Sequence, residues 1–168
     1  GEELGLTQVE IPFDQLQDPE AIANWPLTLA RDGARTPLPW QAQSEQGGFT
    51  ASSAPWLPLG EENMAKAVDR QEGDPASLLN LTRSLLALRH QTPALRNGTC
   101  DVVLADAARL VLRRTSGDDS VLAVFNISAA DAGWPEGLST DGTPIFAVNG
   151  AEPGRLPAFG AVLIRESN

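Results

Sequence analysis

Residues 31–40 read RDGARTPLPW, and this stretch determines how the chain around it is interpreted. Its two prolines fix φ, and each pushes the residue before it toward extended conformations. Similar combinations of proline and tryptophan occur at residues 25–26 and 55–58. These stretches should be rigid without being helical, which favours a long structured loop over a regular element.

The zone around this stretch, from residue 1 to about residue 73, is irregular and rich in Pro, Gly, Gln and Trp. A segment this long without a strong element exceeds an ordinary connection inside a compact domain. We expect it to carry function or to bridge parts of a larger body. A short helix is predicted near residues 18–22, with Asp18 as N-cap and Pro19 at the first helical position. A second, weak helix is predicted over residues 63–69.

The clearest local prediction is a helix over residues 74–91. Asp74 is its N-cap candidate, Pro75 takes the first helical position, and Pro93 ends it. One face of this helix consists of Leu78, Leu81, Leu85 and Leu88. A wide apolar stripe requires a partner surface, and we expect that surface to be a sheet.

The remainder of the chain is predicted to be β-structure. Short apolar runs occur at residues 102–104, 109–114, 121–126, 144–148 and 161–165, and turn residues at 117–119 join the second and third into a hairpin. Strands at this spacing predict a small antiparallel sandwich. The residues alone therefore indicate a β-module preceded by a helix and a long structured loop.

Length and composition limit the number of domains and the classes of partner. The 168 residues correspond to one domain, or to one domain plus part of another. A net charge of −10 repels phosphate backbones, so no nucleic-acid partner is expected. No apolar run approaches the roughly 18 residues of a membrane helix, so no membrane partner is expected either. The first residues do not resemble a signal peptide, and a cytoplasmic location is expected.

Cysteine and histidine usage restricts the chemistry further. Cys100 and His90 are the only residues of their types. They exclude an internal disulfide framework, a multi-cysteine zinc site and a two-histidine metal site. A Ser-His-Asp arrangement would have to use His90. Carboxylate chemistry is the main catalytic option left, and no cofactor is expected.

The stretch at residues 31–40 closely resembles the RDGxRTPMPW signature of α-glucosidases in glycoside hydrolase family 13, the α-amylase superfamily. Further motifs of that family follow in its order, namely GEELG at 1–5, GF at 48–49, WLP at 56–58 and DPxSLL at 74–79. The resemblance covers roughly the whole chain. Leu38 stands where the signature usually has methionine.

This resemblance implies the C-terminal part of a (β/α)8 TIM barrel followed by an antiparallel β-sandwich. Residues 1–92 would hold the last βα unit of the barrel with its long active-site loop, and residues 93–168 the sandwich. A whole barrel takes about 250 residues, so the N-terminal remainder of the same enzyme is an expected partner. The resemblance implies that the catalytic carboxylates and the metal site precede this part, so no catalytic residue is assigned here and no metal is expected.

Two residues are expected to bind substrate. The resemblance implies that Arg31 contacts the glucose in subsite −1, where a guanidinium can donate to a sugar hydroxyl and to a carboxylate together. The alternative is that Arg31 and Arg35 only pair with Asp32 or Glu3 to hold the loop, and Asp32 itself is expected to brace it. Gln8 follows barrel strand seven and would face the acceptor subsite; the alternative is a solvated loop residue.

Aromatic rings are weaker candidates. Their apolar faces match the C–H faces of pyranoses, but a ring in a long loop is more often a packing anchor than a sugar-stacking surface. The candidates are Trp25, Trp40, Phe49 and Trp56.

The resemblance implies part of a retaining α-glucosidase that hydrolyses or transfers α-glucosyl units from short α-glucosides. Two alternatives remain open at this point. One is a non-catalytic β-sandwich module that binds glucan or stabilises a partner. The other, raised by Leu38, is a relative that acts on sucrose or trehalose.

Overall fold

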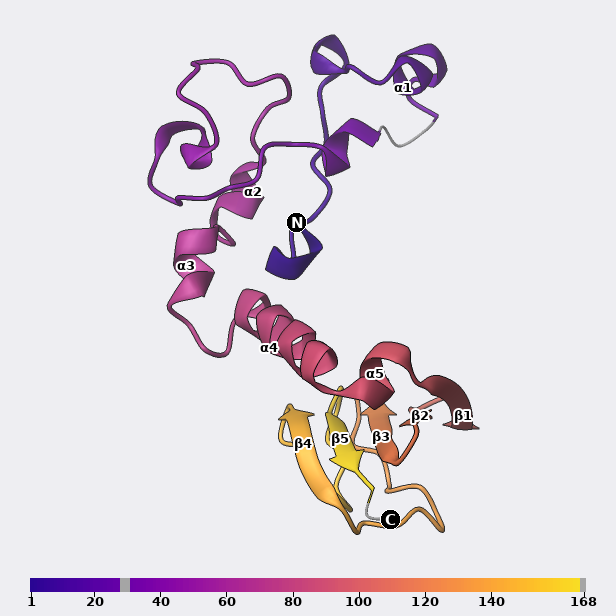
Figure 1. The fold of residues 1–168 in the computed structure, drawn as a ribbon. Coiled ribbons are helices and arrows are strands. Elements are labelled where there is room, and N and C mark those ends of the chain that lie inside the picture. Colours follow the sequence, from indigo (N-terminus) through magenta and orange to yellow (C-terminus); the bar gives the residue numbers. More distant parts are fainter. Residues whose placement is uncertain (28–30, 167–168) are drawn as a thin grey trace. The chain divides into compact units, whose positions relative to one another are not determined.

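The computed structural model describes residues 1–27 and 31–166. The chain divides into two compact units, Gly1–Leu85 and Leu86–Asn168, which are described separately below (Figure 1). The predicted domain boundary after residue 92 stays a prediction.

The first unit consists of short helices joined by loops. Its elements are the 3₁₀ helices Glu2–Leu4, Phe13–Gln15, Arg31–Ala34 and Glu45–Gly48 and the α-helices α1 (Pro19–Asn24), α2 (Glu61–Met64) and α3 (Val68–Glu72). A small core of Ile11, Leu16, Ala21 and Leu57 holds the loops together. The residues described in this unit contain no β-strand, so the predicted barrel stays a prediction.

The two short helices expected in this unit have different outcomes. The prediction near residues 18–22 is confirmed by α1, because the Asp18 side chain accepts the Glu20 N–H at 3.2 Å and Pro19 is the first helical residue. The prediction of one helix over residues 63–69 is wrong. Helix α2 ends at Met64 and α3 begins only at Val68, because Ala67 takes an extended backbone with ψ of 153°.

Helix α4 spans Leu78–Gln91, four residues shorter at its start than predicted. Ser77, not Asp74, is its N-cap, since the Ser77 Oγ accepts the Asn80 N–H at 3.2 Å. The Asp74 carboxylate instead accepts the Ala76 N–H at 2.9 Å in the turn before the helix. No helix among the described residues is long and apolar enough to cross a membrane.

The second unit is built on a five-stranded antiparallel sheet with the order β1-β2-β3-β5-β4. The strands are β1 (Thr99–Ala105), β2 (Arg109–Ser116), β3 (Asp119–Asn126), β4 (Thr143–Val148) and β5 (Ala161–Arg165). All five predicted strands are confirmed. Gly117, at φ of 58°, makes the tight turn of the β2–β3 hairpin, where a side chain would be strained.

Both faces of this sheet are covered. Val124 and Ile164 face the irregular connections between β3 and β5, where Ala151 and Leu156 complete a buried cluster. On the opposite face, a second cluster joins the sheet to helix α5 (Pro93–Asn97) through Ala94. These layers are consistent with the predicted sandwich part, although the described residues hold one named sheet and two isolated bridges.

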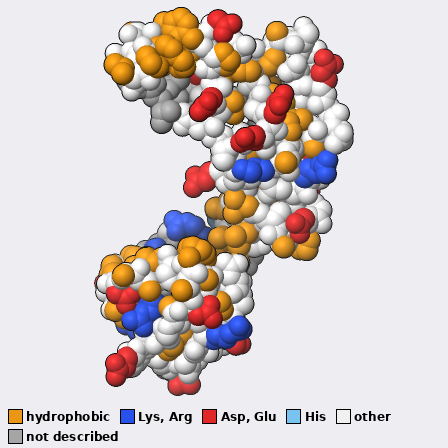
Figure 2. All heavy atoms as spheres, turned by 180° about the vertical axis from the view of Figure 1, so that it is seen from behind, with side chains coloured by type: hydrophobic (Ala, Val, Ile, Leu, Met, Phe, Trp, Pro, Cys, Tyr) orange, Lys and Arg blue, Asp and Glu red, His pale blue; other side chains and the backbone are white. Residues whose placement is uncertain are grey.

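The helix stripe predicted to meet a sheet does so only at its C-terminal end. Leu88 packs against the sheet cluster that contains Ala94. Leu78 and Leu85, two members of the stripe, are exposed. Large apolar side chains are thus part of the molecular surface, where Figure 2 shows them among acidic and basic groups.

Candidate functional site

The turn that carries Arg31 is attached to the segment that carries Gln8. The Val9 N–H donates to the Gly33 carbonyl oxygen at 3.0 Å. A Cβ on Gly33 would lie 2.2 Å from the Val9 carbonyl oxygen and 2.7 Å from Cγ of Gln8, so glycine is required for this approach. The structure therefore brings together two segments that lie far apart in the sequence.

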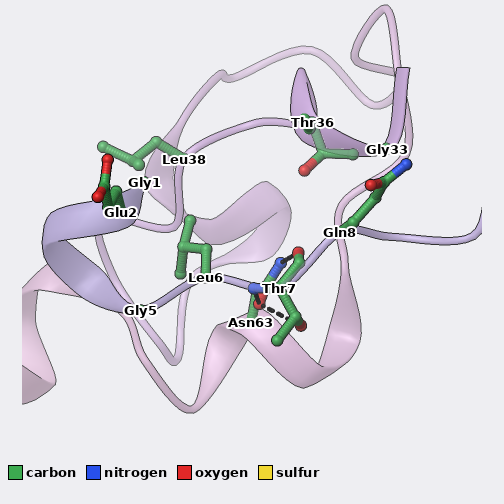
Figure 3. A pocket seen from close by; sticks show the side chains of 11 residues that line it. Gly1, Glu2, Gly5, Leu6, Thr7, Gln8, Gly33, Thr36, Leu38 and Asn63 are labelled. Carbon is green, nitrogen blue, oxygen red and sulfur yellow. Dashed lines mark hydrogen bonds between the residues drawn. The ribbon is translucent and has the colours of Figure 1, made fainter. Parts of the chain in front are cut away.

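A pocket of about 370 Å³ opens beside this junction (Figure 3). The figure shows Gln8 beside Gly33 and Thr36. The lining residues are Gly1, Glu2, Gly5, Leu6, Thr7, Gln8, Gly33, Ala34, Thr36, Leu38 and Asn63. Gln8 also lines a second pocket of about 370 Å³, in which the acidic residues Glu10, Glu61 and Glu62 lie. Gln8 thus lines both pockets.

Asn63 fixes the wall of this pocket. Its Oδ1 accepts the Thr7 N–H at 3.0 Å and the Thr7 hydroxyl at 3.2 Å, and its Nδ2 donates to the Thr7 carbonyl oxygen at 2.9 Å. The side chain is buried, and these three bonds join residues 56 positions apart. Sequence reasoning missed Asn63, because an isolated asparagine gives no sign of a partner so distant.

Arg31 makes a two-pronged ion pair with Asp18. Its Nε lies 2.8 Å from Oδ2 and its Nη2 lies 2.8 Å from Oδ1. The Asp18 side chain is 2% exposed, whereas the Arg31 side chain is 58% exposed. Arg31 does not line either of the two pockets described above. Its guanidinium is therefore fixed on one edge and open to the surroundings on the other.

Charge and hydrogen bonding keep this pair ionised. Hydrogen bonds from the Arg31 guanidinium hold the pKa of the Asp18 carboxyl well below its usual range. The same contacts raise the pKa of Arg31 above its ordinary value. Sequence reasoning identified Asp18 only as a helix cap, and it named Asp32 or Glu3 as partners of Arg31 only in the alternative to substrate binding.

Asp32 braces the loop, as expected. Its side chain is fully buried, and Oδ2 accepts the N–H groups of Gln17 at 2.6 Å and Asp18 at 2.8 Å. Its other oxygen, Oδ1, is buried without a hydrogen bond in the described structure. Arg35 is exposed, and its side chain makes no hydrogen bond or ion pair with the residues that the structure describes.

The aromatic candidates lie apart from the pocket beside Gln8. Trp56 is exposed and lines a third hollow with Asp14 and Gln17. The ring of Trp25 lies 5.8 Å from that of Phe13 in a tilted arrangement. Their expected stacking on sugars stays a prediction. Among the described residues, no group of three or more His, Cys, Asp or Glu side chains is arranged to hold a metal ion.

The chain was compared with models of known protein families. Residues 1–98 match the model described as the catalytic domain of α-amylase. This chain belongs to the α-amylase family. The recognition based on the stretch at residues 31–40 is thereby confirmed.

Curated relatives of this α-amylase-family chain are named as glycoside hydrolases. The chain is 42% identical over 128 residues to a probable α-glucosidase of Rhizobium meliloti (strain 1021), a match that covers 76% of the chain and 23% of the relative. It is 35% identical over 127 residues to the probable oligo-1,6-glucosidase 2 of Bacillus subtilis (strain 168), which covers 74% and 22%. The chain thus spans about a quarter of the length of these relatives.

Solved structures that share this fold include an α-glucosyl transfer enzyme and a trehalulose synthase. The chain aligns with the α-glucosyl transfer enzyme XgtA at a TM-score of 0.83 and 36% identity, over 99% of this chain and 32% of that one. It aligns with the trehalulose synthase MutB from Pseudomonas mesoacidophila MX-45 at a TM-score of 0.81 and 26% identity, over 98% and 34%. The fold is therefore shared along nearly the whole chain.

Proposed function

We propose that this chain is the C-terminal portion of a retaining α-glucosidase that hydrolyses or transfers α-glucosyl units of short α-glucosides. The observation that carries the proposal is the Arg31 guanidinium, which is fixed along one edge by a buried carboxylate and remains more than half exposed. The names of the curated relatives support the reaction class. A small α-glucoside is the proposed substrate, and the cytoplasm the proposed location.

The proposed division of labour follows from the chemistry. The N-terminal remainder of the enzyme supplies the nucleophilic carboxylate, which attacks the anomeric carbon, and the acid, which protonates the departing oxygen. Arg31 donates to a hydroxyl of the glucosyl unit, and its positive charge keeps a nearby nucleophile ionised. The Gln8 amide, which can donate and accept, binds the leaving group or the incoming acceptor. The attack forms a covalent glucosyl-enzyme intermediate. Water or a sugar hydroxyl then attacks its anomeric carbon, which releases the product and frees the carboxylate.

The test uses the full-length enzyme that contains this chain, with a nitrophenyl α-glucoside as substrate. We expect Arg31→Ala to lower kcat/KM at least about tenfold, because hydrogen bonds from charged groups are stronger than neutral ones. Arg35→Ala removes an equal charge four residues away and should change kcat/KM less than about twofold. Equal effects of the two substitutions would contradict the proposal.

A second measurement concerns the chain alone. The isolated 168 residues should show no turnover, since the reacting carboxylates are proposed to lie in the remainder. Turnover by the isolated chain would overturn this assignment. Titration of the isolated chain with maltose and isomaltose distinguishes the proposed function from the alternative of a free-standing glucan-binding module. Such a module would bind sugar without the remainder of the enzyme.

The likeness to XgtA and MutB favours transfer as a second candidate activity of the same site. Leu38, at the position where the signature has methionine, lines the pocket beside Gln8. Its side chain would influence the balance between hydrolysis and transfer. Analysis of products from maltose and from sucrose distinguishes the outcomes. Free glucose without any new saccharide indicates hydrolysis, whereas new oligosaccharides or a sucrose isomer indicate transfer.

A further inference from the structure

Four hydrogen bonds converge on the carboxylate of Asp18. Oδ2 accepts the backbone N–H of Arg31 at 3.2 Å and its Nε at 2.8 Å, while Oδ1 accepts Nη2 of Arg31 at 2.8 Å and the Glu20 N–H at 3.2 Å. Both oxygens are thus fixed by the backbone as well as by the guanidinium. A carboxylate held in this way has one orientation, which a surface ion pair does not.

Asp32 fixes the same segment from behind. Its buried Oδ2 accepts the N–H of Asp18 at 2.8 Å and that of Gln17 at 2.6 Å. Asp32 follows Arg31 directly in the sequence, so two neighbouring residues hold Asp18 by its side chain and by its backbone. The turn and the start of α1 are therefore held to each other in both directions, by backbone N–H groups that donate to the carboxylates of Asp18 and Asp32.

The ion pair also determines which donors of Arg31 remain available. Nε and Nη2 face the carboxylate, whereas Nη1 makes no hydrogen bond within the described part of the chain. An arginine without an ion-pair partner samples many rotamers and loses that entropy when it binds a ligand. An arginine whose guanidinium is already fixed along one edge loses less entropy on binding. The free edge is then presented in a defined direction.

We propose that Asp18 is a positioning residue for substrate binding: it holds the Arg31 guanidinium so that its free edge donates to a hydroxyl of the glucosyl unit, and Asp32 keeps Asp18 in place. This inference rests on the proposed function, in which Arg31 contacts the sugar. Asp18 does not touch the substrate and acts only through Arg31.

The test compares Asp18→Asn with Glu20→Gln in the full-length enzyme. The D18N substitution is isosteric and keeps an N-capping oxygen, but it removes the charge and one acceptor. Glu20 is a matched acidic control, 3.9 Å from Arg31 and 63% exposed. With a nitrophenyl α-glucoside, we expect D18N to raise KM about tenfold with a smaller change in kcat, and E20Q to change both less than about twofold.

A double-mutant cycle separates positioning from a merely structural role. If Asp18 acts through Arg31, D18N should lower kcat/KM in the wild-type background and have no further effect in the R31A background. Additive effects of the two substitutions would overturn the inference, as would a D18N enzyme with unchanged KM. Loss of folding in both D18N and Asp18→Ser, which also keeps a capping oxygen, would assign Asp18 to the scaffold and overturn it too.

The same set of variants distinguishes this inference from the proposed function. If R31A leaves kcat/KM unchanged, Arg31 does not bind the sugar and the proposed function fails. If R31A lowers kcat/KM and D18N does not, only the positioning role fails.

Discussion

Substitution of Gly33 by alanine tests the junction between the turn at residues 31–34 and the segment that carries Gln8. The new Cβ would lie 2.2 Å from the Val9 carbonyl oxygen, a separation that real Cβ atoms essentially never show. The two backbones would have to move apart by about 1 Å, which also weakens the 3.0 Å hydrogen bond from Val9 to Gly33. Overpacking together with that lost bond should cost about 2–4 kcal/mol of the free energy of unfolding.

Activity should fall as well, because Gln8 would be displaced relative to the turn. A misplacement of this size lowers kcat/KM by about 10- to 100-fold in enzymes that depend on substrate positioning. The assays are urea denaturation of the full-length enzyme and turnover of a nitrophenyl α-glucoside. Gly73→Ala is the control, since a Cβ there meets nothing within 4 Å and the backbone has φ of −84°. The control should be neutral or slightly stabilising. A Gly33→Ala enzyme as stable and active as the control would refute the reasoning.

Two further predictions concern stability. Ser77→Ala should lower the free energy of unfolding by about 1 kcal/mol in urea denaturation, because it removes the oxygen that caps helix α4 at the Asn80 N–H. Hydrogen bonds from Arg113 and Ser120 lower the pKa of Glu166 below its ordinary value, so its stabilising effect is complete above about pH 4.3 and is lost as the pH falls through the lower folded value. Glu166→Gln should therefore weaken the acid dependence of stability below about pH 4.3, as measured by denaturation at a series of pH values.

Each of these has a matched control. Ser84 lies on the exposed side of the same helix, and Ser84→Ala should change stability by less than about 0.5 kcal/mol. Glu136 is exposed, and Glu136→Gln should change the free energy of unfolding by less than about 0.5 kcal/mol. A capping role for Ser77 is contradicted if both serine variants behave alike, and the role of Glu166 is contradicted if both glutamine variants do.

Local signals were sufficient wherever an element is determined by its own residues. Helix α1 was predicted from Asp18 and Pro19, because the Asp18 side chain caps the neighbouring Glu20 N–H and Pro19 is the first helical residue. The β2–β3 hairpin follows from two short apolar runs on either side of the turn at Gly117. The sequence could predict these because capping and turn formation need only neighbouring atoms.

Features that depend on distant residues could not be predicted in this way. Helix α4 begins at Leu78 because the Gln71 side chain accepts the Leu79 N–H at 3.1 Å, and Asn80 donates to three carbonyl oxygens of the preceding turn. Asp74 and Ser77 are both good caps by type, and these side chains decide between them. The bond network of Asn63 spans 56 positions and leaves no pattern in the sequence.

The candidate site was predictable in its parts but not in its connections. Arg31 and Gln8 were both singled out, and the structure attaches their segments to each other through Gly33. The sequence analysis assigned Asp18 only the role of a helix N-cap, which uses one of its two carboxylate oxygens. A capping carboxylate has a second oxygen that remains free to bind a cation, and this signal would have identified the ion pair.

Strand β1 lies at one edge of the sheet, and its pairing with β2 shifts register between Val102 and Leu104. Val102 and Val103 are both exposed, so two adjacent valines lie toward solvent at this bulge. A straight apolar edge would offer a template on which another molecule could add a strand and begin a fibril. The shift of register interrupts that template, because a bulge disrupts the regular row of backbone donors and acceptors along the edge.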